Sequence, residues 1–279
     1  MTLFVFSALL AAALLHAGWN ALVRRDPDRN AATVAVAVGG VVVGLAVAPF
    51  LPPMNLGAIP FVLGSSCFHI VYYALIARAY RHADLSVAYP IMRGLAPLIV
   101  TVVGATFLGE FVGTLQFVGI AIVTAGIVTL GLDGWRGGKA GIAAALLNAV
   151  VIAAYTLVDG LGARASGAPA TYTAWILVGG GMLTLGWNLL RLGTPVLQAT
   201  RNRILLGLSG GVMGFGAYAI ALWAMTIAPI GAVAAVRESS VLFAAALGAI
   251  FLGERFGPAR WVAAALVVAG LALVRFGGA

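Results

Sequence analysis

Apolar residues form long continuous runs along this chain, separated by short polar or Gly/Pro-containing breaks. Ten such runs lie near residues 3–23, 31–51, 58–79, 85–108, 114–132, 140–160, 170–190, 204–226, 230–252 and 259–276. A helix crosses the hydrocarbon core of a bilayer in about 20 apolar residues. The runs are continuous and do not alternate, which favours helices over a barrel. The pattern therefore predicts an all-α integral membrane protein with ten transmembrane helices.

The composition supports a surface that faces lipid. Of the 279 residues, 62% are hydrophobic and 9% are charged, whereas soluble domains carry roughly 25% charged residues. The net charge of +8 comes from basic residues that lie mostly between the apolar runs. That placement indicates orientation in a membrane and not nucleic-acid binding. No Lys or Arg precedes the first run, so we interpret it as a span and not as a signal peptide.

The two halves of the chain repeat each other. The string Phe107–Glu110 recurs 144 residues later as Phe251–Glu254. At the same offset Arg93 matches Arg237, Leu98 matches Leu242, Phe117 matches Trp261 and Gly126 matches Gly270. At an offset of 136, Trp19–Val23 aligns with Tyr155–Asp159. We predict two five-helix repeats, 1–135 and 136–279, in one membrane domain. Because five is odd, the second repeat must be inverted, an arrangement that many transporters use.

Four sequence segments resemble those of a known family. They are Leu15–Leu22 (LHAGWNAL), Ala88–Gly94 (AYPIMRG), the two Leu-Gly-Glu helix ends, and Val236–Phe243 (VRESSVLF). Over nearly its whole length the chain resembles EamA-type transporters of the drug/metabolite transporter superfamily. The resemblance implies ten helices around a central cavity lined by helices 1, 3, 4, 6, 8 and 9. It implies no particular substrate.

Two arguments about orientation disagree. Twelve of the sixteen basic residues lie in the loops after odd-numbered helices, and two lie in the other loops and the termini. The positive-inside rule then places both termini outside the cell. The resembled family is described with both termini in the cytoplasm. Either way, we expect a multi-pass protein of a bacterial-type inner (plasma) membrane.

Two arginines interrupt the apolar runs near the middles of helices 4 and 9. A charge at the bilayer centre costs about 2.5–3.5 kcal/mol on insertion scales, so Arg93 and Arg237 each need a partner, water or a ligand. Their planar guanidinium groups can bind a carboxylate or phosphate at two points. The alternative is structural pairing with Glu238. Glu238 has two candidate roles, counter-ion and proton-coupling carboxylate, and neither role excludes the other. We interpret Asp159 as a solvated residue at the end of helix 6.

Other polar and aromatic residues lie along helix faces. The further candidates for a substrate site are His16, Trp19, Asn20, His69, Tyr72, Tyr73, Tyr89, Asn148, Tyr155 and Tyr218. Residues at i, i+3 and i+4 share a face, and polar faces of membrane helices turn inward. Interhelical hydrogen bonding or an interfacial position is the alternative for each. Pro90, Gly94 and Pro97 predict a helix 4 that is broken or kinked around Arg93 at the binding site, and a simple packing kink is the alternative.

The two Leu-Gly-Glu strings mark predicted helix ends. Glu110 and Glu254 are expected near the positive N-terminus of the next helix, and neither is a candidate ligand for a substrate. The lone Cys67 excludes an internal disulfide. No phosphate loop, metal-ligand spacing or Ser/His/Asp arrangement is present. We therefore expect no enzyme, no cofactor and no metal.

The function that fits these features is secondary transport. We expect alternating access of the two repeats to a small organic metabolite, anionic or zwitterionic and amino-acid-like, with proton coupling as an option. A non-transporting membrane scaffold or partner subunit is the alternative. An intramembrane enzyme that uses Glu238 with a histidine ranks below both. Substrate identity, coupling ion, direction and oligomeric state do not follow from the sequence.

Overall fold

The computed structural model describes residues 1–132, 138–252 and 257–277, and every regular element in these residues is a helix. Side chains of a few further residues, Tyr73 among them, lie outside the description. The α-helices are α1 (Leu3–Arg25), α2 (Arg29–Val47), α3 (Ile59–His82), α4 (Leu85–Phe107), α5 (Thr114–Leu132), α6 (Lys139–Ser166), α7 (Pro169–Leu192), α8 (Pro195–Arg201), α9 (Ile204–Ile227), α10 (Ile230–Arg237), α11 (Ser240–Leu252) and α12 (Pro258–Phe276). Two short 3₁₀ helices, η1 (Ala48–Phe50) and η2 (Leu56–Ala58), connect α2 to α3.

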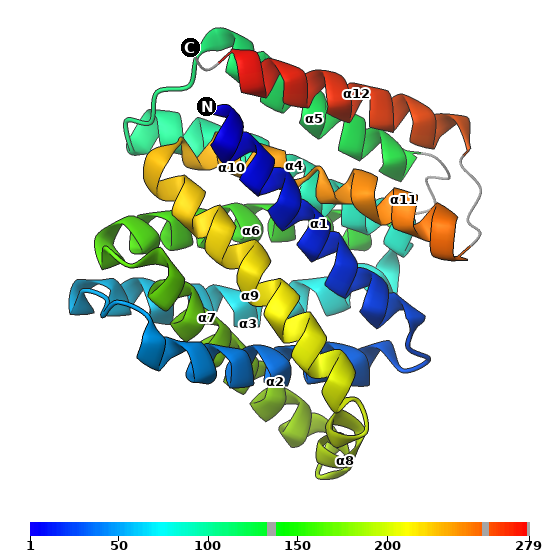
Figure 1. Ribbon diagram of the computed structural model, residues 1–279. Coiled ribbons are helices and arrows are strands. Elements are labelled where there is room, and N and C mark those ends of the chain that lie inside the picture. Colours follow the sequence, from blue (N-terminus) through cyan, green and yellow to red (C-terminus); the bar gives the residue numbers. More distant parts are fainter. Residues whose placement is uncertain (133–137, 253–256, 278–279) are drawn as a thin grey trace.

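Eight segments of the described chain are long and apolar enough to cross a membrane. They are Leu3–Arg25, Arg29–Phe50, Leu56–His82, Val87–Phe107, Lys139–Ser166, Pro169–Leu192, Ile204–Ile227 and Ile230–Leu247. Helix α5 contributes a shorter apolar stretch, Thr114–Leu130, and packs alongside α12 (Figure 1). The chain is thus an all-helical multi-pass membrane protein, and the count of ten spans stays a prediction.

Helix boundaries follow from local chemistry. The side chains of Thr2 and Asp28 accept backbone N–H groups at the starts of α1 and α2, over 3.3 and 3.0 Å. Such caps satisfy donors that have no partner inside the helix. At the other end, Gly167 closes α6 in the left-handed conformation (φ 64°), which glycine adopts without steric cost.

Small residues allow the helices to approach one another closely. A Cβ atom on Gly39 of α2 would lie 1.8 Å from the carbonyl oxygen of Gly207 in α9, so the two backbones touch there. Large apolar side chains point outward instead, as shown by Phe50, Leu190 and Leu205, each at least 80% exposed. An outer surface of this kind suits lipid, because close backbone packing and not hydrophobic burial holds membrane helices together.

The loops gather on two faces of the bundle. On one face Asp26, after α1, pairs with Arg203, before α9. On the other face the backbone N–H of Asn55, before α3, donates to the carbonyl of Ser166 at the end of α6, and Arg164 of α6 reaches the end of α9. Helices α1 and α6, which begin the two halves of the sequence, therefore end at opposite ends of α9 (Figure 1).

Candidate functional site

A break in the ninth apolar run creates the centre of the site. Helix α10 ends at Arg237 and α11 begins at Ser240, with a tight turn in which the N–H of Val241 donates to the carbonyl of Glu238 over 3.0 Å. The turn sets the neighbouring Arg237 and Glu238 side chains in the interior of the bundle. No glycine or proline lies at residues 237–240, so the sequence gives little sign of this break.

The predicted break in helix 4 is not found, because α4 is one continuous helix from Leu85 to Phe107 with Pro90 and Pro97 inside it. Proline at position 97 has no N–H, so the carbonyl of Arg93 loses its usual helical donor. The hydroxyl of Thr101 donates to the carbonyl of Pro97 over 2.7 Å. The prolines therefore loosen the backbone beside Arg93 without dividing the helix.

Arg93 and Glu238 form a two-point ion pair. Nη2 of Arg93 lies 2.7 Å from Oε1 of Glu238, and Nε donates to Oε2 over 3.2 Å. The two side chains are only 11% and 7% exposed. This is the structural pairing that the sequence left as an alternative for Arg93, and it joins α4 of the first half to the α10–α11 turn of the second. Because both carboxylate oxygens are engaged, Glu238 acts as a counter-ion in this conformation.

Arg237 has a different environment from its sequence counterpart. Its guanidinium carbon lies 5.1 Å from the centre of the Tyr218 ring, over the face of an aromatic residue of α9. Such cation–π contacts stabilise a cation without neutralising its charge. Arg237 makes no ion pair with any residue that the structure describes. Its charge is thus available to an anion.

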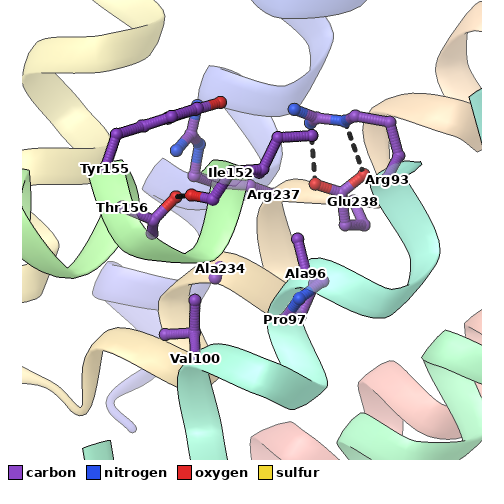
Figure 2. A pocket seen from close by; sticks show the side chains of 10 residues that line it. All are labelled: Arg93, Ala96, Pro97, Val100, Ile152, Tyr155, Thr156, Ala234, Arg237 and Glu238. Carbon is purple, nitrogen blue, oxygen red and sulfur yellow. Dashed lines mark hydrogen bonds and ion pairs between the residues drawn. The ribbon is translucent and has the colours of Figure 1, made fainter. Parts of the chain in front are cut away.

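A small polar cavity lies between α4, α6 and α10 (Figure 2). Its lining is Arg93, Ala96, Pro97, Val100, Ile152, Tyr155, Thr156, Ala234, Arg237 and Glu238. The volume of this cavity is about 10 Å³, which is room for about one water molecule. Both arginines line this space, which among the described residues is smaller than the solute-sized cavity that the family resemblance implies.

An aromatic cluster joins α3 to α6 next to this cavity. The rings of His69 and Tyr155 stack with centres 4.8 Å apart, and Tyr72 meets His69 and Tyr155 edge-on, at 6.2 and 6.1 Å. The phenols of Tyr72 and Tyr155 lie within electrostatic range of Arg93. Three of the predicted site residues thus come together here, whereas the side chain of Tyr73 lies outside the described part.

The predicted residues of α1 divide into two groups. His16 packs edge-on against Trp19, with ring centres 5.3 Å apart, and lies within electrostatic range of both Arg93 and Arg237. The amide of Asn20 donates to the carbonyl of His16 over 2.8 Å, so this group is used within its own helix. The structure therefore brings His16 and its aromatic neighbour toward the arginines but gives Asn20 a local role.

Two further predicted residues lie at the edge of the site. Tyr89, one helical turn before Arg93, is 37% exposed and within electrostatic range of Arg93 and Glu238. Asn148 is fully buried, and its amide donates to the sulfur of Met92 over 3.0 Å. The carbonyl oxygen of the Asn148 side chain has no hydrogen-bond partner among the described residues. Asn148 thus packs α6 against α4.

Asp159 is buried, so the expectation of a solvated helix end was wrong. Helix α6 continues to Ser166, and the Asp159 side chain is 0% exposed. Its carboxylate accepts hydrogen bonds from the hydroxyls of Tyr218 and Tyr172, the latter over 3.4 Å. A sequence signal for this burial existed, since Asp159 follows Asn148 and Tyr155 along one face of the helix.

Glu110 was expected near the start of the next helix, α5, but it caps a different one. Its Oε2 accepts the backbone N–H of Ile230, the first residue of α10, over 2.8 Å. Its Oε1 pairs with Nη2 of Arg164 over 2.6 Å, and Nε of Arg164 donates to the carbonyl of Met225 in α9. The carboxylate thus ties the end of α4 to three helices of the second half. Its counterpart Glu254 lies outside the described residues.

The described residues contain no group of three or more His, Cys, Asp or Glu side chains that could hold a metal ion. The charged groups in the interior instead form a site suited to organic ions. Arginine offers an anion two parallel hydrogen bonds and aromatic rings offer flat apolar faces. The arrangement is thus suited to a ligand that combines a carboxylate with an apolar body.

Comparisons with known proteins agree with this architecture. A curated relative is "Nicotine metabolites export pump subunit NepA" of Paenarthrobacter nicotinovorans, 34% identical over 68 residues, or 24% of this chain. The match spans 59% of that relative's length. A crystal structure at 20% identity superposes with a TM-score of 0.70, covering 98% of this chain and 97% of that one, and so shows the same fold. Residues 139–276 match the EamA-like transporter family. Through these residues, about half of its length, the chain is similar to EamA-like transporters.

Proposed function

We propose that this protein is a secondary transporter of small anionic or zwitterionic organic metabolites in a bacterial-type inner membrane. The observation that carries the proposal is Arg237, a guanidinium inside a span without an ion pair among the described residues, at the break between α10 and α11. A charge inside a membrane protein is costly to keep and marks substrate or ion paths. A bound carboxylate would supply the counter-ion that Arg237 lacks.

The broken helix supports the same proposal. Discontinuous helices at mid-membrane are a recurring way for transporters to place charged and backbone groups on a substrate. Here the break presents Arg237 toward a space that also receives Tyr155 from α6 and Arg93 from α4 (Figure 2). Paired Arg93 would then shape the site and Arg237 would bind the anion. This division is a proposal about roles, since the two arginines occupy matching positions in the sequence.

Alternating access of two inverted five-helix repeats is the mechanism we propose. Its support is that α1 and α6 end at opposite ends of α9, as an inverted repeat requires. The cavity of about 10 Å³ is too small for an organic solute. Transport would therefore require the halves to move relative to each other, with the Arg93–Glu238 and Glu110–Arg164 pairs among the contacts between them.

The named relative bears on substrate class. It is described as a subunit of an export pump for nicotine metabolites, which are small organic compounds. We extend to this chain only the size class of the solute. An amino-acid-like compound fits because it offers one carboxylate for Arg237 and an apolar part for the His69, Tyr72 and Tyr155 rings.

The test is flux through the purified protein in proteoliposomes. A panel of anionic, zwitterionic and cationic metabolites is offered, and counterflow of each labelled solute is measured. We expect anionic or zwitterionic solutes to exchange, Arg237→Ala to abolish exchange, and Arg237→Lys to retain part of it. Arg203→Ala is the matched control, because that arginine lies in a loop. Full exchange by Arg237→Ala, or transport restricted to cations, would overturn the proposal.

A non-transporting scaffold is the second candidate, and the small cavity is the observation that favours it. A scaffold keeps its interior filled in every state. It therefore predicts no exchange of any solute and no thermal stabilisation by solutes. A transporter predicts that at least one solute raises the melting temperature, since a ligand that binds only the folded state stabilises it in proportion to its occupancy. Arg237→Ala should remove that shift.

A further inference from the structure

Asp159 is a buried acid that forms no ion pair with an arginine or lysine of the described residues. Its side chain is 0% exposed. The groups that hold it are hydroxyls, Tyr218 of α9 and Tyr172 of α7. Hydroxyl donors stabilise a carboxylate but leave its charge in place, and an uncompensated charge in such a setting favours protonation. Glu238 differs, because Arg93 neutralises it.

Each helix around Asp159 contributes a group that faces it. From α3, His69 lies within electrostatic range, and the buried Ser65 hydroxyl lies close without a well-formed hydrogen bond. From α7 comes Tyr172, whose hydroxyl occupies the space where a Cβ of Gly162 would lie, 2.1 Å away. From α9 comes Tyr218, and Tyr155 on α6 itself is within electrostatic range. These groups surround the carboxylate with polar atoms.

Tyr218 connects the acid to the proposed substrate arginine. Its hydroxyl donates to Oδ2 of Asp159, while its ring carries the guanidinium of Arg237 on one face. Any change in the charge of Asp159 therefore acts on Tyr218, whose ring contacts the guanidinium of Arg237.

The interior charges balance only when Asp159 is ionised. Four charged side chains of the described spans lie more than five residues from a helix end when α10 and α11 are counted as one span. They are Arg93, Asp159, Arg237 and Glu238. With both acids ionised their sum is zero. Protonation of Asp159 leaves one positive charge in excess, and a monovalent anion at Arg237 restores the balance. A proton and an anion thus favour each other's binding.

We propose that Asp159 is a proton-binding site coupled through Tyr218 to Arg237, so that a proton and an anionic solute occupy the protein together. The inference rests on the proposed function for its solute but concerns a different residue. The step is a simple protonation: a proton from water on one side bonds to the Asp159 carboxylate, and the same bond breaks when the proton leaves to the other side. With Asp159 ionised and no solute bound, the four interior charges sum to zero.

A first test reads the proton directly and needs no solute. Infrared difference spectra of the purified protein are recorded as pH is changed, and the carbonyl stretch of a protonated carboxyl group is followed. We expect a pH-dependent band that Asp159→Asn removes and that Glu238→Gln leaves in place. Tyr218→Phe should keep the band at an altered frequency, because the hydroxyl no longer bonds to the group. A band that survives in Asp159→Asn would overturn the proposal, as would the absence of any titrating band in the wild type.

A second test separates coupling from transport. A solute that the wild type exchanges is offered to proteoliposomes with an imposed pH gradient of one unit, which can drive about tenfold accumulation per coupled proton. We expect Asp159→Asn to retain exchange but to lose accumulation, with Asp26→Asn as an acid control that keeps both. Accumulation by Asp159→Asn equal to that of the wild type would refute the coupling. Absence of exchange in the wild type would instead refute the proposed function and leave the infrared result standing.

Discussion

Arg93 and Arg237 occupy matching places in the two halves of the sequence, yet they meet different partners. Arg93 is held by a carboxylate at two points, and Arg237 lies on an aromatic ring. The difference arises because Glu238 follows Arg237 and the helix breaks there, whereas Gly94 follows Arg93 in a continuous helix. One acid can neutralise one of the two arginines. A symmetric pair in the sequence thus becomes an asymmetric pair in the protein.

The Arg93–Glu238 pair should show strong energetic coupling. Removing one member leaves a buried charge uncompensated, which costs about 3–5 kcal/mol. We therefore expect Arg93→Gln and Glu238→Gln each to lower the melting temperature sharply in detergent. The double variant Arg93→Gln with Glu238→Gln should lose less stability than the two single losses added together. Purely additive losses would show that the two side chains do not depend on each other.

A second ion pair lies outside the spans and should make stability depend on pH. Hydrogen bonds from Arg203 hold the pKa of Asp26 below its ordinary value of 3.8. The contribution is therefore present above pH 3.8 and is lost as pH falls through the lower pKa of the folded protein. We expect wild type to melt above Asp26→Asn at neutral pH, and the two melting curves to converge in strong acid. A difference that grows as pH falls would contradict this assignment.

Packing between α2 and α9 depends on glycines at several close approaches, of which Gly39 is the tightest. A methyl group at Gly39 would overlap the carbonyl of Gly207, and helix backbones have little freedom to separate. We expect Gly39→Ala to destabilise the protein by about 1–3 kcal/mol, as overpacking does elsewhere. Gly214→Ala is the matched control on α9, because a methyl group there would have no other atom within 4 Å. Thermal unfolding in detergent measures both, and equal melting temperatures would refute the close contact.

The helices could be predicted from the apolar runs, but their interruptions could not. Each run overlaps a helix because length and hydropathy in a membrane leave the backbone no other choice. Pro90 and Pro97 indicated a break or kink, but both lie inside one continuous helix, so no break occurs there. The real break lies at Glu238. There the pairing with Arg93 is a tertiary interaction, and a sequence read alone does not contain it.

The candidate site was predictable in its members more than in their contacts. Polar residues inside apolar runs identified the arginines and the His69, Tyr72 and Tyr155 cluster. Asp159 was misinterpreted because the sixth apolar run ends at residue 160, which placed Asp159 at a helix end. Instead, Gly160 packs against Ile230 of α10, and the helix continues. A glycine that serves packing and a glycine that ends a helix look alike until the neighbouring helix is known.

The whole molecule has two faces that differ in charge. The loops after the odd-numbered apolar runs of the sequence carry twelve basic residues. Hydrogen bonds show that Asp26 and Arg203, from two of these loops, share one face. The positive-inside rule assigns that face to the cytoplasm. A reporter enzyme that works only outside the cytoplasm is fused after Ala279. We expect this fusion to be active. Activity of a cytoplasm-only reporter at the same place would instead support the orientation described for the family.

The opposite face should control access to the interior. There Glu110 joins Arg164 and the start of α10, and these contacts link the two halves of the chain. In a Cys67→Ser background, a Thr156→Cys variant reports opening, because Thr156 lines the cavity and is 5% exposed. We expect Arg164→Ala to speed maleimide labelling of that cysteine about 5-fold or more, the effect of a coupling near 1 kcal/mol.

The control for this experiment comes from the other face. Arg203→Ala removes another carboxylate–arginine pair, between Asp26 and the start of α9, but both of its partners lie at the opposite loops. If Glu110 and Arg164 hold the halves together at their own face, only Arg164→Ala should raise the labelling rate. Equal acceleration by both variants would mean that any loss of a loop ion pair loosens the bundle. No acceleration by either would place the barrier at the Arg93–Glu238 pair, deeper in the protein.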